Sequence, residues 1–424
     1  MLTKLKKISL GNWILISMIL GLIVGLILNF YVTDPFIKEI ILIDNVFFLG
    51  GTLFIKLMKM LVVPLVFCSI IVGVTSISDI RKIGAIGGRA ILIYLITTAL
   101  AVTIALLIAK IINPGIGLNM VGLADASNVT TNVTITNTIL SMVPENPLNS
   151  LANGDMLPVI IFGVIIGIIL AKLKDETETI NKIFSEGNTI MMEMTRIVMK
   201  FAPIGVFCLM AKTFATLGFD GLIPLSKYIA CILLALAVQA FIVYPTLLVI
   251  LTRLNPMKFF RKFFSVMLFA FSSSSSNATI PLNLEKLSEL GVSRDVSSFT
   301  IPLGATINMD GTAIMQGVAV MFASQAYGMD LGVSALITVI FTAVMASIGT
   351  AGVPSVGLIT LNMVFGSVGL PTDAIGIIMG IDYILDMVRT AVNVTGDAIC
   401  TIIVAFKNKS IDLDAFNSKK RIES

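Results

Sequence analysis

Residues 374–406 read AIGIIMGIDYILDMVRTAVNVTGDAICTIIVAF, an apolar run that carries four charged residues, Asp382, Asp386, Arg389 and Asp397, accompanied by Thr390 and Asn393. Counted from Asp382, the others follow at offsets of 4, 7, 8, 11 and 15. At about 100° per residue, nearly all of them lie on one narrow face of a helix. Each ionisable group inside a membrane-spanning helix costs roughly 2.5–3.5 kcal/mol. We therefore expect this face to hold an ion or a charged solute.

The composition indicates an all-α, polytopic membrane protein. Of the 424 residues, 56% are hydrophobic and 13% are charged, and the mean hydropathy is +1.00, whereas a soluble domain carries about 25% charged residues. Repeated apolar runs of 18 or more residues predict transmembrane helices. No segment is long and polar enough for a soluble domain, so residues 1–424 are predicted to form one integral membrane unit.

The composition also argues against several chemistries. The chain has no histidine, which excludes histidine catalysis, histidine metal ligation and a histidine proton relay. Its four cysteines lie in or beside apolar runs without a CxxC pair, which is typical of packing residues. The net charge of +4 does not indicate a nucleic-acid partner, because the Lys and Arg residues lie mostly in short loops and at the ends.

Apolar spans in the first part of the chain lie near residues 12–30, 45–76, 84–112, 154–173, 188–213 and 226–252. Basic residues mark the cytoplasmic side of a membrane protein. They occur before the first span, after the second, fourth and sixth, and in the C-terminal tail, whereas residues 126–138 carry no charge. Both termini are therefore predicted to be cytoplasmic, with an even number of full crossings and a retained first helix.

Two later apolar runs are interrupted at mid-length. Residues 257–290 contain SSSSSNATIP at 272–281, and residues 335–369 contain SIGTAGVP at 347–354. Neither half of either run is long enough to cross alone, and bare backbone at that depth needs protein or water partners. Each run is therefore predicted to be a re-entrant helical hairpin. Each is followed by a helix with polar residues, which suggests an inverted repeat with a midplane site, a common plan for a secondary transporter.

Seven motifs resemble the glutamate/aspartate transporter family of dicarboxylate and amino acid:cation symporters. They are MLVVPLVF (60–67), NPLNSLANGDMLP (146–158), FAPIGVF (201–207), SSSSSNATIP (272–281), PLGATINMDGTA (302–313), IGTAGVP (348–354) and ILDMVRTAVNVTGD (384–397). The resemblance covers essentially the whole chain. It implies eight transmembrane helices plus two re-entrant hairpins, a homotrimer in the cell membrane and an elevator mechanism. The transport part would comprise roughly residues 84–112 and 256–410, and the trimerising scaffold roughly 12–76 and 113–253.

The resemblance also assigns a substrate site. Arg389 would bind the side-chain carboxylate of the substrate, because a guanidinium matches a carboxylate in two parallel hydrogen bonds. Asp386 would take the substrate's α-ammonium group. The rest of the implied site consists of Asn393, Thr390, Thr312, Ser275, Ser276, Gly352, Val353 and Pro354. An internal ion pair between Arg389 and Asp386 is the simpler alternative reading of these two residues.

Three sodium sites are implied in the same way, and hard cations prefer carboxylate, hydroxyl and carbonyl oxygens. The first would consist of Asp397, Asn393, Gly304 and Asn308, the second of Asp310, Tyr94, Thr97, Thr98 and Asn308, and the third of Thr306, Ser347, Ile348 and Thr350. Without the resemblance, residues 94, 97 and 98 would be ordinary helix-packing residues. Asp382 is predicted to be a structural carboxylate, hydrogen-bonded near the first hairpin.

The presence of both Asp386 and Arg389 favours an acidic amino acid as substrate. Family branches for dicarboxylates lack the ammonium partner and branches for neutral amino acids lack the arginine, while cystine is an alternative because it has a distal carboxylate. Family members usually carry a further arginine at one of two positions, which here are Ser274 and Met387. Asn277 also stands where a serine is common. These departures leave affinity, counter-transport and the choice between aspartate and glutamate open.

These features predict a symporter that couples sodium entry to uptake of aspartate or glutamate, without an organic cofactor and with membrane lipid around it. Proton coupling is the main alternative, and the hydroxyl cluster at residues 94, 97 and 98 favours sodium. An anion channel is disfavoured because opposite charges and hairpin tips suit binding and occlusion better than a continuous pore. An enzyme is disfavoured because the chain has no HExxH motif and no recognisable nucleophile–base pair.

Overall fold

The computed structural model describes residues 10–32, 34, 36–77, 85–118, 140, 143–154, 156–173, 176–218, 222–348, 356–372 and 374–418. The helices of the first half are α1 (Leu10–Tyr31), η1 (Phe36–Phe47), α2 (Phe48–Ile77), α4 (Ala85–Ile112), α6 (Pro147–Asn153), α7 (Met156–Lys172), α8 (Glu178–Met199), α9 (Ala202–Leu217), α10 (Leu222–Val238), η4 (Gln239–Val243) and α11 (Tyr244–Thr252). Those of the second half are α12 (Pro256–Ser273), α13 (Ser276–Glu289), α14 (Arg294–Ile307), α15 (Asp310–Ala326), α16 (Val333–Ser347), α17 (Val356–Ser367), α18 (Ala374–Lys407) and α19 (Leu413–Asn417).

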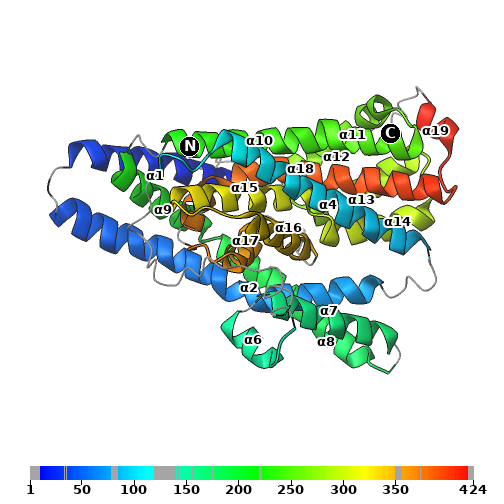
Figure 1. The fold of residues 1–424 in the computed structure, drawn as a ribbon, viewed down its shortest axis with the longest axis horizontal. Coiled ribbons are helices and arrows are strands. Elements are labelled where there is room, and N and C mark those ends of the chain that lie inside the picture. Colours follow the sequence, from blue (N-terminus) through cyan, green and yellow to red (C-terminus); the bar gives the residue numbers. More distant parts are fainter. Residues whose placement is uncertain are drawn as a thin grey trace, which may run out of the picture.

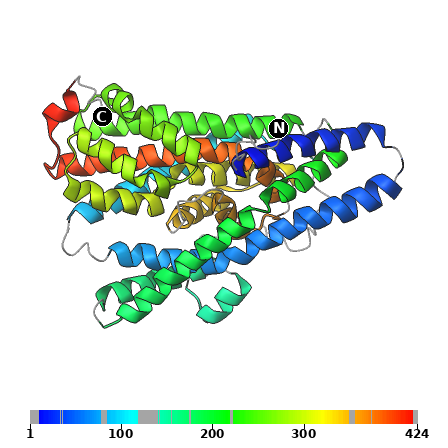
Figure 2. The ribbon, with the colours of Figure 1, turned by 180° about the vertical axis from the view of Figure 1, so that it is seen from behind.

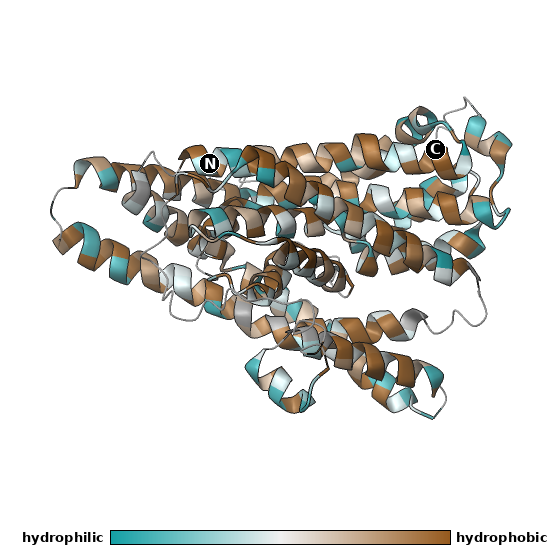
Figure 3. Ribbon diagram, viewed as in Figure 1, coloured by the Kyte–Doolittle hydropathy of each residue, from teal (hydrophilic) through white to brown (hydrophobic). Residues whose placement is uncertain are grey.

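Among the described residues, four helical stretches are long and apolar enough to cross a membrane, namely Asn12–Tyr31, Phe36–Thr75, Ile86–Ile112 and Leu222–Thr252. Helices α8 and α9 pass the same test together, with a bend of 53° between them. Apolar residues predominate along these helices (Figure 3). The described residues contain no β-strand, only one isolated bridge. The all-α, polytopic fold is confirmed, while the count of eight crossings stays a prediction.

Helix α18 lies inside the helical bundle (Figures 1 and 2). It packs against α4, α9, α12, α14 and α15, and its residues are buried along almost all of its length. Helix α15 is buried on every face, because Gln325 is the one residue between 310 and 326 that is not buried. A charged stripe on α18 is therefore shielded from lipid by other helices, which is the arrangement expected for ionisable groups within a membrane.

The first predicted hairpin corresponds to α12 and α13, which pack against each other. Between them, Ser274 adopts the left-handed conformation with φ of 49°, which ends α12. Ser275 then caps the N-terminus of α13, because its side chain accepts a hydrogen bond from the Ala278 amide at 3.2 Å. Ser and Asn side chains favour such caps because they satisfy amide groups that have no intrahelical partner. Helices α16 and α17 also pack against each other, and residues 349–354 of the predicted interruption at 347–354 lie outside the described residues.

Helices α10 and α11, joined by the π-turn η4, form one continuous span. This span packs on α4, α15 and α18. The sequence-based division assigned it to the scaffold part and those three partners to the transport part. The division stays a prediction, but the packing bears on where its boundary should be drawn.

The C-terminal segment folds back onto α12. Lys262 donates hydrogen bonds to the carbonyl groups of Ala415 at 2.8 Å and Phe416 at 3.3 Å, at the end of α19. Phe416 is fully buried, and Ile411 pairs with Val292 in the isolated antiparallel bridge. This segment therefore ties the base of α12 and the turn before α14 to the end of α18.

Candidate functional site

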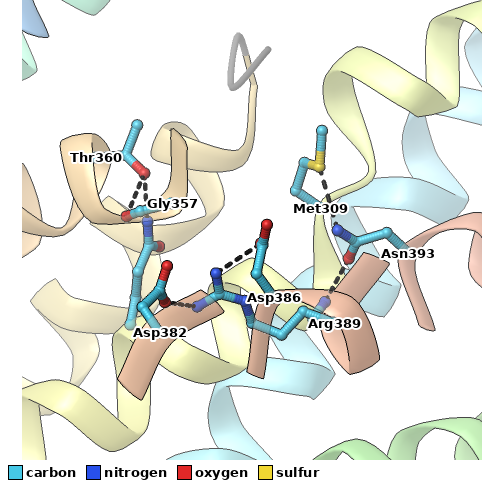
Figure 4. A network of polar contacts seen from close by, with 9 residues as sticks. Met309, Gly357, Thr360, Asp382, Asp386, Arg389 and Asn393 are labelled. Atoms are coloured by element: carbon cyan, nitrogen blue, oxygen red, sulfur yellow. Dashed lines mark hydrogen bonds and ion pairs between the residues drawn. The ribbon is translucent and has the colours of Figure 1, made fainter. Parts of the chain in front are cut away.

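Arg389 is fully buried and forms two ion pairs on its own helix (Figure 4). Its Nη1 lies 2.6 Å from Oδ1 of Asp382, and its Nη2 lies 2.7 Å from Oδ1 of Asp386. The two carboxylates stand seven and three residues before the arginine, positions that share a helix face with it. The ion pair with Asp386, which was the alternative to a substrate role for Arg389, is present in this structure. Asp382 was expected to be hydrogen-bonded near the first hairpin, but the partner that the structure gives it is Arg389.

The three charges are not balanced. Two carboxylates face one guanidinium, so an excess of negative charge remains in a buried place, where charge interactions are strong. Oδ2 of Asp382 and Nε of Arg389 have no hydrogen-bond partner among the described residues. Helix α17 covers the arginine, because a Cβ at Gly357 would lie 3.6 Å from Arg389 Nη2. The arrangement can accept both an anionic and a cationic group from a ligand.

A break in the helical backbone lies beside this cluster. Helix α14 ends at Ile307 and α15 begins at Asp310, with Asn308 and Met309 in non-helical conformations. Oγ of Ser347, at the end of α16, donates to the Ile307 carbonyl at 2.6 Å and accepts from the Met309 amide at 3.0 Å. Broken helices of this kind leave carbonyl groups and amides free of intrahelical bonds, so that they can serve as ligands.

Asn393 joins the break to the charged stripe (Figure 4). Its Oδ1 accepts a hydrogen bond from the Gly311 amide at 2.7 Å, and its Nδ2 lies 3.3 Å from Met309 Sδ. A Cβ at Gly311 would lie 2.7 Å from the Arg389 carbonyl oxygen, so glycine permits the close approach of α15 and α18. Asn393 was predicted for both the substrate site and the first sodium site.

Asp310 is the centre of a second cluster. Thr98 donates to its Oδ1 at 2.6 Å, and Thr97 lies 3.5 Å from the same atom. Thr97 also lies 3.2 Å from Oδ1 of Asn308. All of these side chains are at most 1% exposed. The structure therefore brings together four residues of the predicted second sodium site, Asp310, Asn308, Thr97 and Thr98, whereas the hydroxyl of the fifth, Tyr94, binds the Thr300 carbonyl.

Two further residues, which sequence analysis did not identify, donate hydrogen bonds to Asp310. Gln239 Nε2 donates to its Oδ2 at 3.0 Å, and Tyr244 Oη donates to the same atom at 2.8 Å. Gln239 is the polar residue of an otherwise apolar stretch, which is a signal for a functional residue inside a membrane helix. Because residues five apart lie on different faces of a regular α-helix, the sequence did not indicate that Gln239 and Tyr244 bind the same carboxylate.

Asp397 forms the third part of the site. Its Oδ1 accepts a hydrogen bond from Asn308 Nδ2 at 2.9 Å, so one amide side chain contacts both the Asp310 cluster and Asp397. Gly304 lies against it, because an added Cβ would be 2.6 Å from Asp397 Oδ1 and 3.0 Å from Tyr94 Oη. Tyr94 Oη itself donates to the Thr300 carbonyl at 2.9 Å. The predicted first-site residues Asp397, Gly304 and Asn308 are thus neighbours, while Tyr94 contacts them from the edge.

Some of the remaining predicted site residues are described by the structure, and others lie outside the described ranges. Thr312 lies in the first turn of α15, and Thr390 lies on α18 beside Arg389; both are buried. Ser276 is buried at the start of α13. Thr306 donates to the Leu303 carbonyl of its own helix at 2.9 Å, and Ile348 caps α16 in an extended conformation. Thr350, Gly352, Val353 and Pro354 lie outside the described residues.

The groups gathered around Asp310 and Asp397 offer mainly oxygen atoms as ligands. Within the described ranges, no group of three or more His, Cys, Asp or Glu side chains could hold a metal ion. The clusters around Asp310 and Asp397 instead mix carboxylate, amide, hydroxyl and carbonyl oxygens, the set that hard, weakly held cations use. They are joined to the Arg389 cluster through Asn393 and the helix break.

Comparison with known proteins supports a transport function. The family model described as "Sodium:dicarboxylate symporter family" matches residues 10–406. The chain is 35% identical over 411 residues to the "Proton/sodium-glutamate symport protein" of Bacillus caldotenax, covering 95% of each protein. It is 35% identical over 410 residues to the "Proton/glutamate-aspartate symporter" of Escherichia coli (strain K12), covering 94% of this chain and 93% of that one.

A eukaryotic relative is also similar over nearly its full length. The "Excitatory amino acid transporter" of Caenorhabditis elegans is 32% identical over 476 residues, covering 97% of this chain and 92% of that protein. These relatives are transporters, not enzymes.

Proposed function

We propose that this chain, which belongs to the sodium:dicarboxylate symporter family, couples the entry of sodium to the uptake of aspartate or glutamate. The observation that carries the proposal is the position of Arg389. A buried guanidinium between two carboxylates lies on α18 four residues before Asn393, and the Asn393 side chain is hydrogen-bonded to the first turn of α15, beside the helix break. Substrate and ion sites are thus contiguous.

Recognition of an acidic amino acid follows from the charges of the first cluster. The substrate's distal carboxylate takes the place of one aspartate on Arg389, because a guanidinium can bind it through two hydrogen bonds. The Asp386 carboxylate released in this way binds the α-ammonium group. A dicarboxylate without the amine would displace Asp386 from Arg389 and offer its buried carboxylate no positive charge in return, which is costly. The relatives named for glutamate and aspartate are consistent with this reading.

Sodium coupling is supported by the two oxygen clusters. Asp310 with Thr97, Thr98 and Asn308 would hold one ion, and Asp397 with Asn308 and Gly304 would hold another. Asn393 contacts the Gly311 amide next to Asp310. An ion that fixes Asp310 therefore also fixes the Gly311 amide that holds the Asn393 side chain, and the binding of ion and substrate becomes linked.

Proton coupling is the second candidate, because relatives are named as proton symporters as well as proton/sodium symporters. In that case Asp310 and Asp397 would carry protons. The hydroxyl and amide oxygens around Asp310 favour sodium, since a proton needs one acceptor and not a cage of oxygens.

For transport we propose the elevator mechanism in a homotrimer, with both termini in the cytoplasm. The moving part would contain α4 and α12 to α18, and the scaffold would contain α1, α2 and α7 to α9. The packing of α10 and α11 on α4, α15 and α18 favours placing this span with the moving part, in contrast to the division drawn from the sequence.

Equilibrium binding of labelled aspartate to the purified protein in detergent tests this function. Aspartate affinity should rise steeply with sodium concentration at constant ionic strength, glutamate should compete, and succinate should not. Affinity that is independent of sodium but rises as the pH falls would favour proton coupling instead. Equal competition by succinate would contradict the role of Asp386.

A further inference from the structure

Gln239 and Tyr244 bind the same carboxylate oxygen although they stand five residues apart. At about 100° per residue, such a spacing separates two side chains of an α-helix by about 140°. The π-turn η4 removes this separation, because the Tyr244 amide bonds to the Gln239 carbonyl and places both residues on one face. Single π-turns of this kind are rare and frequently occur at functional sites. The π-turn therefore lies at the point of the span from which both Gln239 and Tyr244 donate hydrogen bonds to Asp310.

The four donors around Asp310 divide its carboxylate into two halves. Gln239 and Tyr244 contact Oδ2, at 3.0 and 2.8 Å, whereas the threonine hydroxyls contact Oδ1. Oδ1 is thus the oxygen that lies among the predicted sodium ligands. Oδ2 faces away from them, toward the α10–α11 span.

The donors on the two oxygens also differ in how readily they can break their hydrogen bonds to Asp310. Thr97 and Thr98 each have a second acceptor, the Tyr94 carbonyl, at 3.0 and 2.9 Å. Their hydroxyl protons can turn to this carbonyl, so that their oxygens face a cation. Within the described part of the chain, the alternative acceptor for the Tyr244 hydroxyl is the Val392 carbonyl, at a longer distance of 3.4 Å. An ion that binds at Oδ1 would therefore displace the threonine donors and leave those on Oδ2 in place.

The position of the Tyr244 hydroxyl is enforced by close packing. A Cβ at Gly396 would overlap with this hydroxyl and would lie 3.0 Å from Asn308 Nδ2. Tyr244 is fully buried, as is Gln239. The tyrosine thus reaches Asp310 through a space that α18 leaves open one residue before Asp397.

We propose that Gln239 and Tyr244 are positioning residues for sodium: from the π-turn they fix Oδ2 of Asp310, and this directs Oδ1 toward the ion. The inference rests on the proposed sodium site at Asp310 and adds to it a requirement for a third helical span. It makes the α10–α11 span a determinant of sodium affinity, although neither residue contacts the ion.

The test compares three conservative variants. Tyr244→Phe removes one donor to Oδ2, and Gln239→Met removes the other with little change of volume. Tyr228→Phe is the matched control, because Tyr228 is a fully buried tyrosine of α10 whose hydroxyl makes no hydrogen bond with any described residue. Sodium half-saturation is measured by labelled aspartate uptake in proteoliposomes and, without substrate, by the rise of the unfolding temperature with sodium.

We expect Tyr244→Phe and Gln239→Met to raise the sodium half-saturation about 10-fold or more in both measurements, as for the loss of a hydrogen bond to a charged group. The maximal uptake rate at saturating sodium should stay within about threefold of the parent, because Oδ1 and its other ligands remain. Tyr228→Phe should change neither value. If Tyr244→Phe does not fold, Gln239→Met decides the test.

Unchanged sodium half-saturation in the folded Tyr244→Phe and Gln239→Met proteins would overturn the proposal, provided that the parent depends on sodium. Failure of both variants to fold, when Tyr228→Phe folds, would assign the two residues a structural role and overturn it as well. A parent protein without sodium dependence would instead contradict the proposed function, and the positioning role would fall with it.

Discussion

Arg389 and Asp382 lie seven residues apart on α18, and their Nη1–Oδ1 distance is 2.6 Å although both side chains are at most 1% exposed. Seven residues are close to two helical turns, so the arginine extends back along its own helix to reach the carboxylate. The contact holds one side of the guanidinium and leaves Nη2 facing Asp386. A ligand carboxylate can therefore exchange with Asp386 while Asp382 keeps the arginine in place.

Replacing the arginine should abolish uptake of acidic amino acids. In Arg389→Cys the distal carboxylate of aspartate has no cationic partner, and Asp382 and Asp386 are left buried without their counter-charge. We expect no labelled aspartate uptake, uptake of neutral amino acids in its place, and a loss of stability of about 3–5 kcal/mol. Uptake and thermal unfolding check the two effects. Arg294→Cys, at an exposed position, is the control; normal aspartate uptake by Arg389→Cys would show that the arginine has another role.

Replacing Asp397 should weaken sodium and substrate together. Asp397→Asn keeps the shape of the side chain but removes the charge that would hold the cation, and the linkage through Asn308 and the helix break passes the loss on to aspartate. We expect sodium half-saturation to rise by about 10-fold or more, with a parallel loss of aspartate affinity at fixed sodium. Equilibrium binding measures both. The exposed Asp330→Asn serves as the control, and an unchanged sodium dependence in Asp397→Asn would remove this residue from the ion site.

The contact between α14 and α18 should not tolerate a methyl group at Gly304. A Cβ there would lie 2.6 Å from Asp397 Oδ1 and 2.8 Å from its Cγ. Gly304→Ala should therefore displace the carboxylate and weaken sodium binding even though alanine is the better helix former. In the control, Gly366→Ala, the added Cβ meets nothing within 4 Å, and we expect unchanged binding with stability equal or slightly higher. Equal sodium affinity in both variants would refute the close packing at Gly304.

The C-terminal segment should contribute to stability without affecting the ion sites. Phe416 is fully buried where α19 packs on α12, and its truncation to alanine typically costs about 3–5 kcal/mol. We expect Phe416→Ala to lower the unfolding temperature in detergent and to leave sodium half-saturation unchanged. Leu413 lies in the same short helix but is 44% exposed, so Leu413→Ala should change little. Identical unfolding temperatures for the two variants would contradict the docking of this segment.

Period and composition were sufficient to predict the parts of the site that belong to one helix. The positions of Asp386, Arg389, Asn393 and Asp397 on one face of α18 follow from their spacing, and their burial follows from the cost of charges in lipid. The serine-rich interruption likewise predicted the end of α12, where Ser274 adopts the left-handed conformation.

Contacts between distant segments could not be obtained in this way. Thr98 and Asp310 are 212 residues apart in sequence, and only the family resemblance linked them before their hydrogen bond was seen. Gln239 and Tyr244 could not be paired from the sequence, because the α-helical period of 3.6 puts residues five apart on different faces, whereas the π-turn brings them onto one face. A π-turn such as η4 changes the direction of every side chain after it, and the sequence alone does not indicate where such a turn occurs.

The most direct test of the account is labelled aspartate uptake into proteoliposomes, with a sodium, potassium or proton gradient as the only driving force. We predict concentrative uptake with inward sodium, competed by glutamate but not by succinate, and none with the other two gradients. Uptake that is driven by protons alone, without sodium, would contradict sodium coupling and make Asp310 and Asp397 the proton carriers.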